Sequence, residues 1–305
     1  MSTKNEVQIS RIGFGGWQLG NPLWGKMSVE EGINLVKLAF QKGITFFDTA
    51  PSYSNGLSET IIGLALKDCR DQVFINTKIG HLSDGSTDFS ISSMEPQINM
   101  SLSRLNTSYL DSVLLHNPSM EILKGKTYHF QELARLKELG LIKHYGVSID
   151  TYEEFYNAIT YTNIDIIEVL YNIFFQSVHS LFQTTKDKQI KIIIKVPLDS
   201  GWLTGKYHEN SIFTGIRQRW STDDIKRRSN LISEVKSIVN KNDLTATALA
   251  FILKDQNVTS VIPGTKNEAQ LNQNLNALKL TIDNETYTKL INLYQQKIKT
   301  KPLPW

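Results

Sequence analysis

The chain has 305 residues, of which 40% are hydrophobic and 21% are charged, a composition that is ordinary for a folded globular protein. Its net charge of +3 is small and evenly spread, which argues against a nucleic-acid partner. Apolar runs stay well short of the roughly 18 residues of a membrane span, and the N-terminus lacks the apolar core of a signal peptide. We therefore expect a cytoplasmic protein with no membrane partner. The single cysteine, Cys69, excludes an internal disulfide and a cysteine-based zinc site, and no bound metal is expected.

Short apolar or β-branched runs alternate with amphipathic stretches along the chain. The runs predict eight strands, at residues 11–15, 45–48, 73–78, 112–116, 144–147, 166–171, 190–196 and 258–263. The amphipathic stretches predict helices that begin near Ser28, Ser58, Glu95, Phe130, Tyr152, Phe175, Thr245 and Glu268. The first helix is the clearest, because Ser28 and Glu31 form a capping box ahead of it.

This order of elements predicts the fold class. Eight strands separated by helices, without a break in composition, are typical of a single (β/α)8 TIM barrel, so we expect residues 1–305 to form one α/β domain. The longest interval, residues 203–242, predicts a loop and an added helix. Long insertions after barrel strands usually cover active sites, and the alternative is a tolerated surface excursion.

Three consecutive predicted strands end on a titratable residue, namely Asp48, Lys78 and His116. The carboxyl ends of barrel strands meet on the face where barrel enzymes carry out catalysis. Tyr53 lies on the loop that follows Asp48. Each residue alone could be a turn cap or a rim residue, but the four together predict an active site.

The four side chains suit acid catalysis at a carbonyl oxygen. Tyrosine has an ordinary pKa of about 10, so Tyr53 keeps its proton at neutral pH but releases it reluctantly. The ammonium of Lys78 would lower that pKa by stabilising the phenolate, and Asp48 would keep Lys78 charged. His116 could then bind the substrate oxygen and orient it.

Seven segments spread over almost the whole chain resemble motifs of the aldo-keto reductase family. In family order they read GFGGWQLG, FFDTAPSYSNGLSETIIG, NTKIG, SLSRLNTSYLDSVLLHNP, GLIKHYGVS, VPLDSGWLTGKY and IPGTKNEAQLNQNL. The resemblance implies that Tyr53 is the general acid, that Lys78 and Asp48 tune it, and that His116 orients the substrate. It also implies NADPH/NADP+ as the cofactor, a small-molecule carbonyl substrate and an N-terminal β-hairpin, for which residues 5–16 are long enough. A monomer or a small homo-oligomer is expected.

The resemblance also assigns cofactor-binding positions. For the pyrophosphate loop these are Ser200, Gly201, Leu203 and Lys206, and for the adenosine side Gly264, Lys266, Gln270 and Asn274. The set is completed by Gly16 and Trp17, by Ser148 and Glu168 at the nicotinamide carboxamide, and by Tyr171, expected to stack on the ring. Glycines at 201 and 205 also permit close backbone approach, and Lys206 offers charge to a diphosphate. Gln270 and Asn274 could instead form an exposed helix face.

Two positions depart from the family pattern at the expected nicotinamide site. Family members often carry Asn after the Ser of the GVS motif, where this chain has Ile149, which cannot hold a carboxamide. Glu168 replaces an expected Gln. A carboxylate can accept a hydrogen bond from the carboxamide nitrogen but cannot donate one unless it is protonated.

A weaker hypothesis concerns the substrate. Trp17 and, on the long excursion, Arg217, Arg219 and Trp220 could contact an anionic or sugar-like substrate through bidentate bonds and stacking. The alternative is a basic, solvated loop ahead of a helix.

Three functions fit this pattern. The first is an NADP(H)-dependent carbonyl reductase or alcohol dehydrogenase. The second is a non-catalytic nicotinamide-binding barrel that senses redox state for a partner protein. The third is a lyase in which Lys78 forms a Schiff base. The complete set of Asp48, Tyr53, Lys78 and His116 favours the first.

Overall fold

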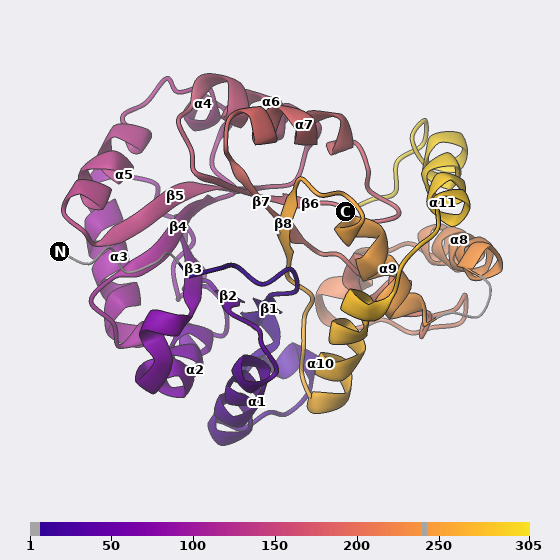
Figure 1. The fold of residues 1–305 in the computed structure, drawn as a ribbon, viewed down its shortest axis with the longest axis horizontal. Coiled ribbons are helices and arrows are strands. Elements are labelled where there is room, and N and C mark those ends of the chain that lie inside the picture. The colour runs from indigo at the N-terminus through magenta and orange to yellow at the C-terminus, as the bar shows by residue number, and fades with distance from the viewer. Residues whose placement is uncertain (1–6, 240–242) are drawn as a thin grey trace.

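A computed structural model of the chain describes residues 7–239 and 243–305. It contains one parallel sheet in which each strand pairs with the next in sequence (Figure 1). The strands are β1 (Phe14–Gly15), β2 (Phe46–Asp48), β3 (Phe74–Ile79), β4 (Leu110–His116), β5 (Ile142–Ile149), β6 (Ile166–Leu170), β7 (Lys191–Lys195) and β8 (Val258–Val261). Two further parallel bridges, Ile12 to Val261 and Gly15 to Gly264, join the first strand to the last and close the circle. The predicted barrel and its eight strands are confirmed.

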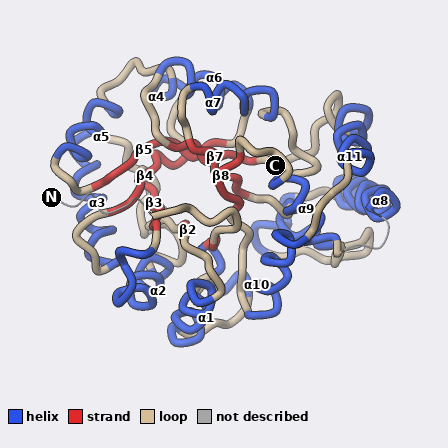
Figure 2. Tube along the Cα trace, in the orientation of Figure 1, coloured by secondary structure: helices blue, strands red, loops and turns tan. Residues whose placement is uncertain are grey.

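The helices surround the ring of strands (Figure 2). They are α1 (Val29–Gln41), α2 (Leu57–Leu66), α3 (Ile91–Leu105), α4 (Met120–Leu123), α5 (His129–Glu138), α6 (Tyr152–Tyr161), α7 (Phe182–Asp187), α8 (Thr222–Val239), α9 (Leu244–Leu253), α10 (Glu268–Leu275) and α11 (Asn284–Lys297). The capping box of Ser28 and Glu31 is present at α1, and α8 is the predicted added helix. Within the described ranges, no helix is long and apolar enough to cross a membrane.

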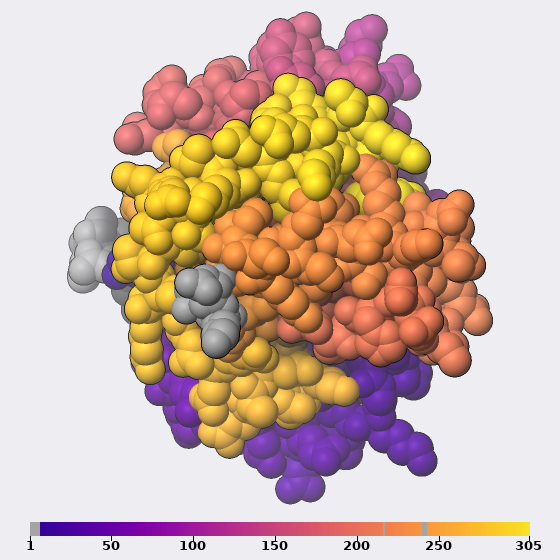
Figure 3. Space-filling view, turned by 90° about the vertical axis from the view of Figure 1, so that its right-hand side faces the viewer, coloured from indigo at the N-terminus to yellow at the C-terminus, as the bar shows by residue number. Residues whose placement is uncertain are grey.

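The helix prediction was wrong at two starts and incomplete at two helices. The helix expected near Glu95 begins four residues earlier, at Ile91. The helix expected near Phe175 begins at Phe182, because Asn172 and Phe175 exchange backbone hydrogen bonds and hold a turn there. Neither the short α4 nor the C-terminal α11 was predicted. The long α8 packs beside α11, and Figure 3 shows the C-terminal segment lying across this face of the molecule. Lys297 of α11 pairs with Glu234 of α8 at 2.6 Å.

The barrel interior holds a small apolar core below the ends of the strands. It is built from Phe46, Phe74, Leu114, Ile166, Ile193 and Ile262. Val7 and Ile9 pack against it, so the N-terminal segment covers this end of the barrel. The described part of the expected β-hairpin, from Val7 on, forms no antiparallel pair, because the side chains of Ser10 and Thr45 bond each other's backbone instead. Residues 5 and 6 of that expected hairpin lie outside the described residues.

Gly146 offers a test of how tightly the strands around the site are packed. It pairs with Ile166 across β5 and β6, and a Cβ added at Gly146 would lie 1.7 Å from the carbonyl oxygen of Ile166. We expect Gly146→Ala to lower the free energy of unfolding by about 3 kcal/mol or more, since the strand can accommodate the methyl group only by breaking its ladder. Urea unfolding measures this loss.

Gly43→Ala is the matched control. Gly43 has a φ of +90°, and a Cβ there would meet nothing within 4 Å. It should cost only the backbone strain of roughly 1–2 kcal/mol. Equal losses in the two variants would contradict the packing argument.

Candidate active site

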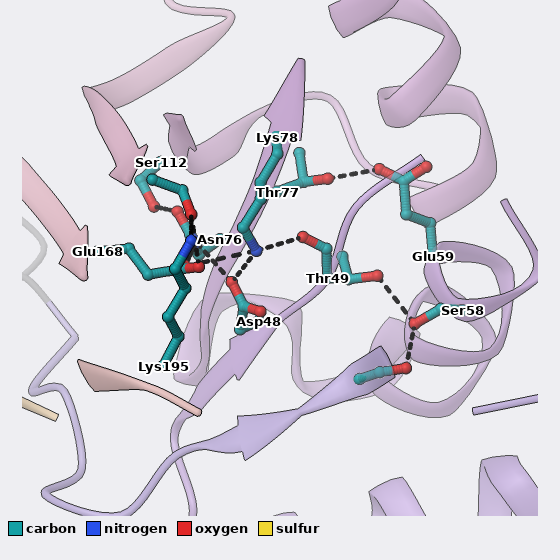
Figure 4. Close-up of polar contacts among 12 residues, drawn as sticks. Asp48, Thr49, Ser58, Glu59, Asn76, Thr77, Lys78, Ser112, Glu168 and Lys195 are labelled. Atoms are coloured by element: carbon teal, nitrogen blue, oxygen red, sulfur yellow. Dashed lines mark hydrogen bonds and ion pairs between the residues drawn. The ribbon is translucent and has the colours of Figure 1, made fainter. Parts of the chain in front are cut away.

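The ammonium of Lys78 lies at the centre of a buried ionic cluster (Figure 4). Lys78 is near the end of β3 and Asp48 ends β2, so the pairing of these strands brings the two side chains together. Lys78 Nζ lies 2.6 Å from Asp48 Oδ1 and donates to the carbonyl oxygen of Thr49 at 3.1 Å. A second carboxylate, Glu168 of β6, lies 3.4 Å from the same ammonium. One buried cation therefore faces two carboxylates.

Neutral side chains of neighbouring strands complete the cluster. The amide nitrogen of Asn76 donates to Asp48 at 2.7 Å and lies 3.4 Å from Glu168. Ser112 of β4 donates to the carbonyl oxygen of Asn76, and Ser148 of β5 donates to the other oxygen of Glu168 at 2.9 Å. The cluster thus draws on five adjacent strands, which fixes its geometry through the sheet.

Tyr53 and His116 stand above this cluster. The Tyr53 ring centre is 5.2 Å from Lys78 Nζ and 6.3 Å from the His116 ring. The loop that carries Tyr53 is held by a run of left-handed residues that ends at Gly56, and the hydroxyl of Ser54 donates to the carbonyl oxygen of Leu19. The four predicted catalytic side chains therefore meet at one place.

Electrostatics keep Lys78 charged and Asp48 partly protonated. Burial opposes the charge of Lys78, but Asp48 and Glu168 raise its pKa above the ordinary value. Burial, followed by the charge of Glu168, raises the pKa of Asp48 to about 7, although Lys78 acts in the opposite direction. Burial acts to raise the pKa of Glu168, yet Lys78 and Lys195 bring it below its ordinary value. Glu168 is therefore the more acidic of the two carboxyls.

Tyr53 behaves differently from the sequence expectation. Burial raises its pKa above the ordinary value, and the opposing effect of Lys78 is smaller because two carboxylates offset that cation. The expectation of a lowered pKa is wrong for this arrangement, and Tyr53 holds its proton firmly. His116 is neutral, since burial and then the charge of Lys78 bring its pKa well below the ordinary value.

A cavity of about 1060 Å³ opens above the catalytic residues. Asp48, Tyr53, His116 and Glu168 line it, whereas Lys78 lies beneath them. The same cavity is also lined by four cations: Lys206, Arg217, Arg219 and Lys266. A ligand that fills the cavity would meet both a proton donor and a group of positive charges.

The loop after β7 forms one wall of the cavity. Ser200 and Gly201 have φ values of 53° and 99°, and both line the cavity. The preceding Asp199 forms an ion pair of 3.0 Å with Arg228 of α8, and both side chains are fully buried. Removing one partner of such a pair would leave the other charge buried and unpaired, which is costly. The pair therefore holds the loop against α8.

The donor set fits a dinucleotide phosphate. Guanidinium nitrogens of Arg217 are buried without a hydrogen-bond partner among the described residues, although the guanidinium lies 4.0 Å from the centre of the Trp24 ring. Arg219 lies 3.5 Å from the Ser200 hydroxyl. The cavity is also lined by Gly264, Lys266, Gln270 and Asn274. Cations and polar donors in a concave wall are what a bound polyanion requires.

Comparison with known proteins agrees with this geometry. The model of the aldo/keto reductase family matches residues 11–295. The chain belongs to the aldo/keto reductase family. Members of this family are oxidoreductases that act on carbonyl compounds, which confirms the resemblance seen in the sequence.

Two relatives and one structure illustrate the range of similar proteins. An NADH-specific methylglyoxal reductase of Escherichia coli is 27% identical over 93% of this chain and 94% of its own length. A probable voltage-gated potassium channel subunit beta of rice (Oryza sativa subsp. japonica) is 27% identical over 97% of this chain and 96% of its own. The structure of the glycerol dehydrogenase of Gluconobacter oxydans matches with a TM-score of 0.80 and 21% identity, over 97% and 94% of the two chains, which supports the fold.

Four residues that the family resemblance or the loop pattern assigned to ligand contacts lie elsewhere. Tyr171 is fully buried against Phe251 and its neighbours, because it follows β6 with its ring turned toward the helices. Leu203 is fully buried in the main apolar core, and Trp220 packs against Trp202. Gly16 lies behind the cavity wall, where an added Cβ would be 2.7 Å from the carbonyl oxygen of Asp48. None of these four lines the cavity, and the stacking role of Tyr171 is wrong.

The other residues predicted to contact the cofactor lie in or directly behind the cavity wall. Trp17 lines the cavity, with its ring centre 6.5 Å from that of Tyr53. Ser148 is buried behind Glu168, and Asn274 donates to the Thr265 hydroxyl at 3.1 Å. Gln270 accepts from the backbone nitrogen of Lys266. These positions are compatible with the predicted cofactor contacts, which remain predictions.

Lys195, Asp150 and Trp305 are among the cavity-lining residues that sequence reasoning missed. Lys195 is the last residue of β7, so the strand-end criterion that selected Lys78 would have found it had the strand been ended one residue earlier. Asp150 directly follows β5. Trp305 has no local signal, because the tail that carries it is held by a bond from Arg228 to the carbonyl oxygen of Pro304.

The raised pKa of Asp48 makes a prediction about stability. A carboxyl that binds its proton more tightly in the folded state adds stability at low pH, and this contribution is lost as pH rises from the ordinary value of 3.8 through about 7. Asp48→Asn lacks the titrating group. The stability of the wild type relative to this variant should therefore fall between about pH 4.5 and pH 7.5 in urea unfolding. A difference that stays constant or grows with pH would contradict the assignment.

Proposed function

We propose that the protein is an NADPH-dependent reductase that converts aldehyde, ketone or sugar carbonyls to alcohols, or catalyses the reverse reaction. The observation that carries the proposal is the shared cavity, which is lined both by Tyr53 and His116 and by a group of cations. Membership of the aldo/keto reductase family supports the reaction class. The bound cofactor supplies the hydride that reaches the carbonyl carbon.

The residues of the chain supply the proton and the orientation. Tyr53 donates its phenolic proton to the carbonyl oxygen as negative charge develops there. The neutral imidazole of His116, which lines the cavity, binds the same oxygen and fixes its approach. The Lys78 ammonium stabilises the phenolate that remains, and Asp48 and Glu168 keep Lys78 protonated.

The two alternative functions have less support. Lys78 is a poor Schiff-base nucleophile, because its ammonium is fully buried and paired with Asp48 at 2.6 Å. Two relatives are named as probable voltage-gated potassium channel subunits beta, and these names bear on a role with a partner protein. A sensor has no need for a proton donor, a tuning pair and an orienting imidazole together, so the intact set favours catalysis.

Tyr53→Phe tests the proposed general acid. The variant should lose roughly 10² to 10⁴-fold in the rate of carbonyl reduction, since the hydroxyl supplies the proton in the transition state. Its affinity for NADPH should stay close to that of the wild type, because the phenol contributes little to nucleotide binding. Absorbance of NADPH with a panel of aldehydes, ketones and sugars measures the rate, and fluorescence titration measures the affinity. Full turnover in the variant would sink the assignment.

The preference for NADPH over NADH depends on Lys266. NADPH carries an additional 2′-phosphate on the adenosine ribose, and Lys266 is a cavity-lining cation at the adenosine end. A hydrogen bond to a charged group is worth about 1.5–3 kcal/mol, which corresponds to a preference of roughly 10 to 150-fold that falls with salt. The NADH-specific Escherichia coli relative shows that the preference must be measured for each member.

Lys266→Met should therefore lose kcat/KM for NADPH and keep kcat/KM for NADH. Lys279→Met is a suitable control, because Lys279 is exposed on the short helical turn after α10 and should affect neither cofactor. A wild-type protein that does not discriminate between the two cofactors would overturn the assignment.

A further inference from the structure

Lys195 is a cation inside the catalytic end of the cavity. It ends β7, lines the cavity beside Glu168 and Asp150, and only 14% of its side chain is exposed. Figure 4 shows it at the ends of the strands together with Glu168 and the Lys78 cluster. The roles described above for the catalytic set do not use it.

The ammonium of Lys195 is directed by three oxygen atoms. Its Nζ lies 3.0 Å from Ser148 Oγ, 3.0 Å from Asp150 Oδ1 and 3.5 Å from Asn117 Oδ1. The contact with Asn117 is long enough to be weak. Lys195 therefore has two firm partners, and its third N–H could donate a hydrogen bond to a ligand.

Of the described side chains that contact Glu168, none lines the cavity with an N–H donor that a carboxamide would need. A carboxamide offers two N–H donors and one oxygen acceptor, so its site must provide both an acceptor and a donor. The Ser148 hydroxyl already donates a hydrogen bond to Glu168 at 2.9 Å and accepts one from Lys195. Glu168 provides an acceptor, and the apolar Ile149 provides nothing. Lys195 is the cavity-lining donor that adjoins Glu168 through Ser148.

We propose that Lys195 donates to the carboxamide oxygen of the nicotinamide while Glu168 accepts from the carboxamide nitrogen. The inference rests on the proposed function and names the polar contacts of its cofactor. The pair replaces the neutral amide side chains that would otherwise serve both ends of the carboxamide. Asp150 holds the ammonium in place. The weak contact with Asn117 is the one that Lys195 gives up when it binds the carboxamide oxygen.

The position of Tyr171 strengthens the need for such a pair. Its ring is packed among the helices and cannot cover the nicotinamide face. Orientation of the ring then depends on polar contacts at the carboxamide. A charged donor and a charged acceptor each form stronger hydrogen bonds than neutral groups do.

The test compares Lys195→Met with the wild type, using two probes in fluorescence or calorimetric titration. NADPH contains the nicotinamide, and 2′-phospho-ADP-ribose lacks it but keeps the phosphates. The variant should bind NADPH about 10-fold or more weakly, and it should bind 2′-phospho-ADP-ribose as the wild type does. Lys195→Gln, which keeps an N–H donor, should recover part of the loss. The reduced 3-acetylpyridine analogue of NADPH replaces the carboxamide by an acetyl group and so keeps the carbonyl oxygen. Its affinity should fall as much as that of NADPH in Lys195→Met.

Lys191→Met is the matched control, since Lys191 lies at the opposite end of the same strand. It should leave both affinities unchanged. Equal losses for the two probes in Lys195→Met would mean a structural role and would overturn the inference. Unchanged affinities with lost turnover of carboxylate-bearing carbonyls would overturn it in favour of an anionic substrate contact. A wild type that binds neither probe would overturn the proposed function as well, which separates the two failures.

Discussion

The site depends on the burial of a single ammonium group, that of Lys78. An amine without exposure to water is stable in the charged form only beside compensating anions. Asp48 and Glu168 provide these anions from strands on two sides, and Asn76 bridges them. Removing one partner of such a cluster typically costs about 3–5 kcal/mol, so the charges proposed to serve catalysis also constrain the strand ends.

The same principle operates where the loop after β7 meets α8. Asp199 and Arg228 form a second fully buried ion pair, and Arg228 also binds the carbonyl oxygen of Pro304. The loop after β7, the helix α8 and the C-terminal tail are thereby joined at one guanidinium. The tail in turn places Trp305 against the cavity. The Lys78–Asp48 and Arg228–Asp199 pairs thus both support the wall of one cavity.

The sequence predicted the barrel well because each element carries a local signal. Strands of a parallel sheet are apolar throughout, and the capping box of Ser28 and Glu31 marks a helix start independently of its partners. The ends of β2, β3 and β4 could be read in the same way, which led to Asp48, Lys78 and His116. The extra turn at Asn172 shifted a helix by several residues because a side-chain and backbone turn competes with helical hydrogen bonds.

What the sequence could not predict depends on contacts between distant segments. The direction of the Tyr53 pKa shift follows from the balance of burial, Lys78 and two carboxylates, and that balance exists only after folding. Tyr171 appeared suitable for stacking, but its ring packs against Phe182 and Phe251, which lie far away in the sequence. Asn76 was overlooked although it lies two residues before Lys78, and the period of two puts both on the inner face.

Transfer of deuterium from cofactor to product tests the central claim most directly. NADPH deuterated at C4 of the nicotinamide would be incubated with the protein and a panel of carbonyl compounds, with Lys78→Met as the disabled control. The account predicts an alcohol that carries deuterium on the former carbonyl carbon, formed by the wild type and at a greatly reduced rate by the variant. Alcohol without deuterium on that carbon, or equal transfer by the Lys78→Met variant, would contradict it.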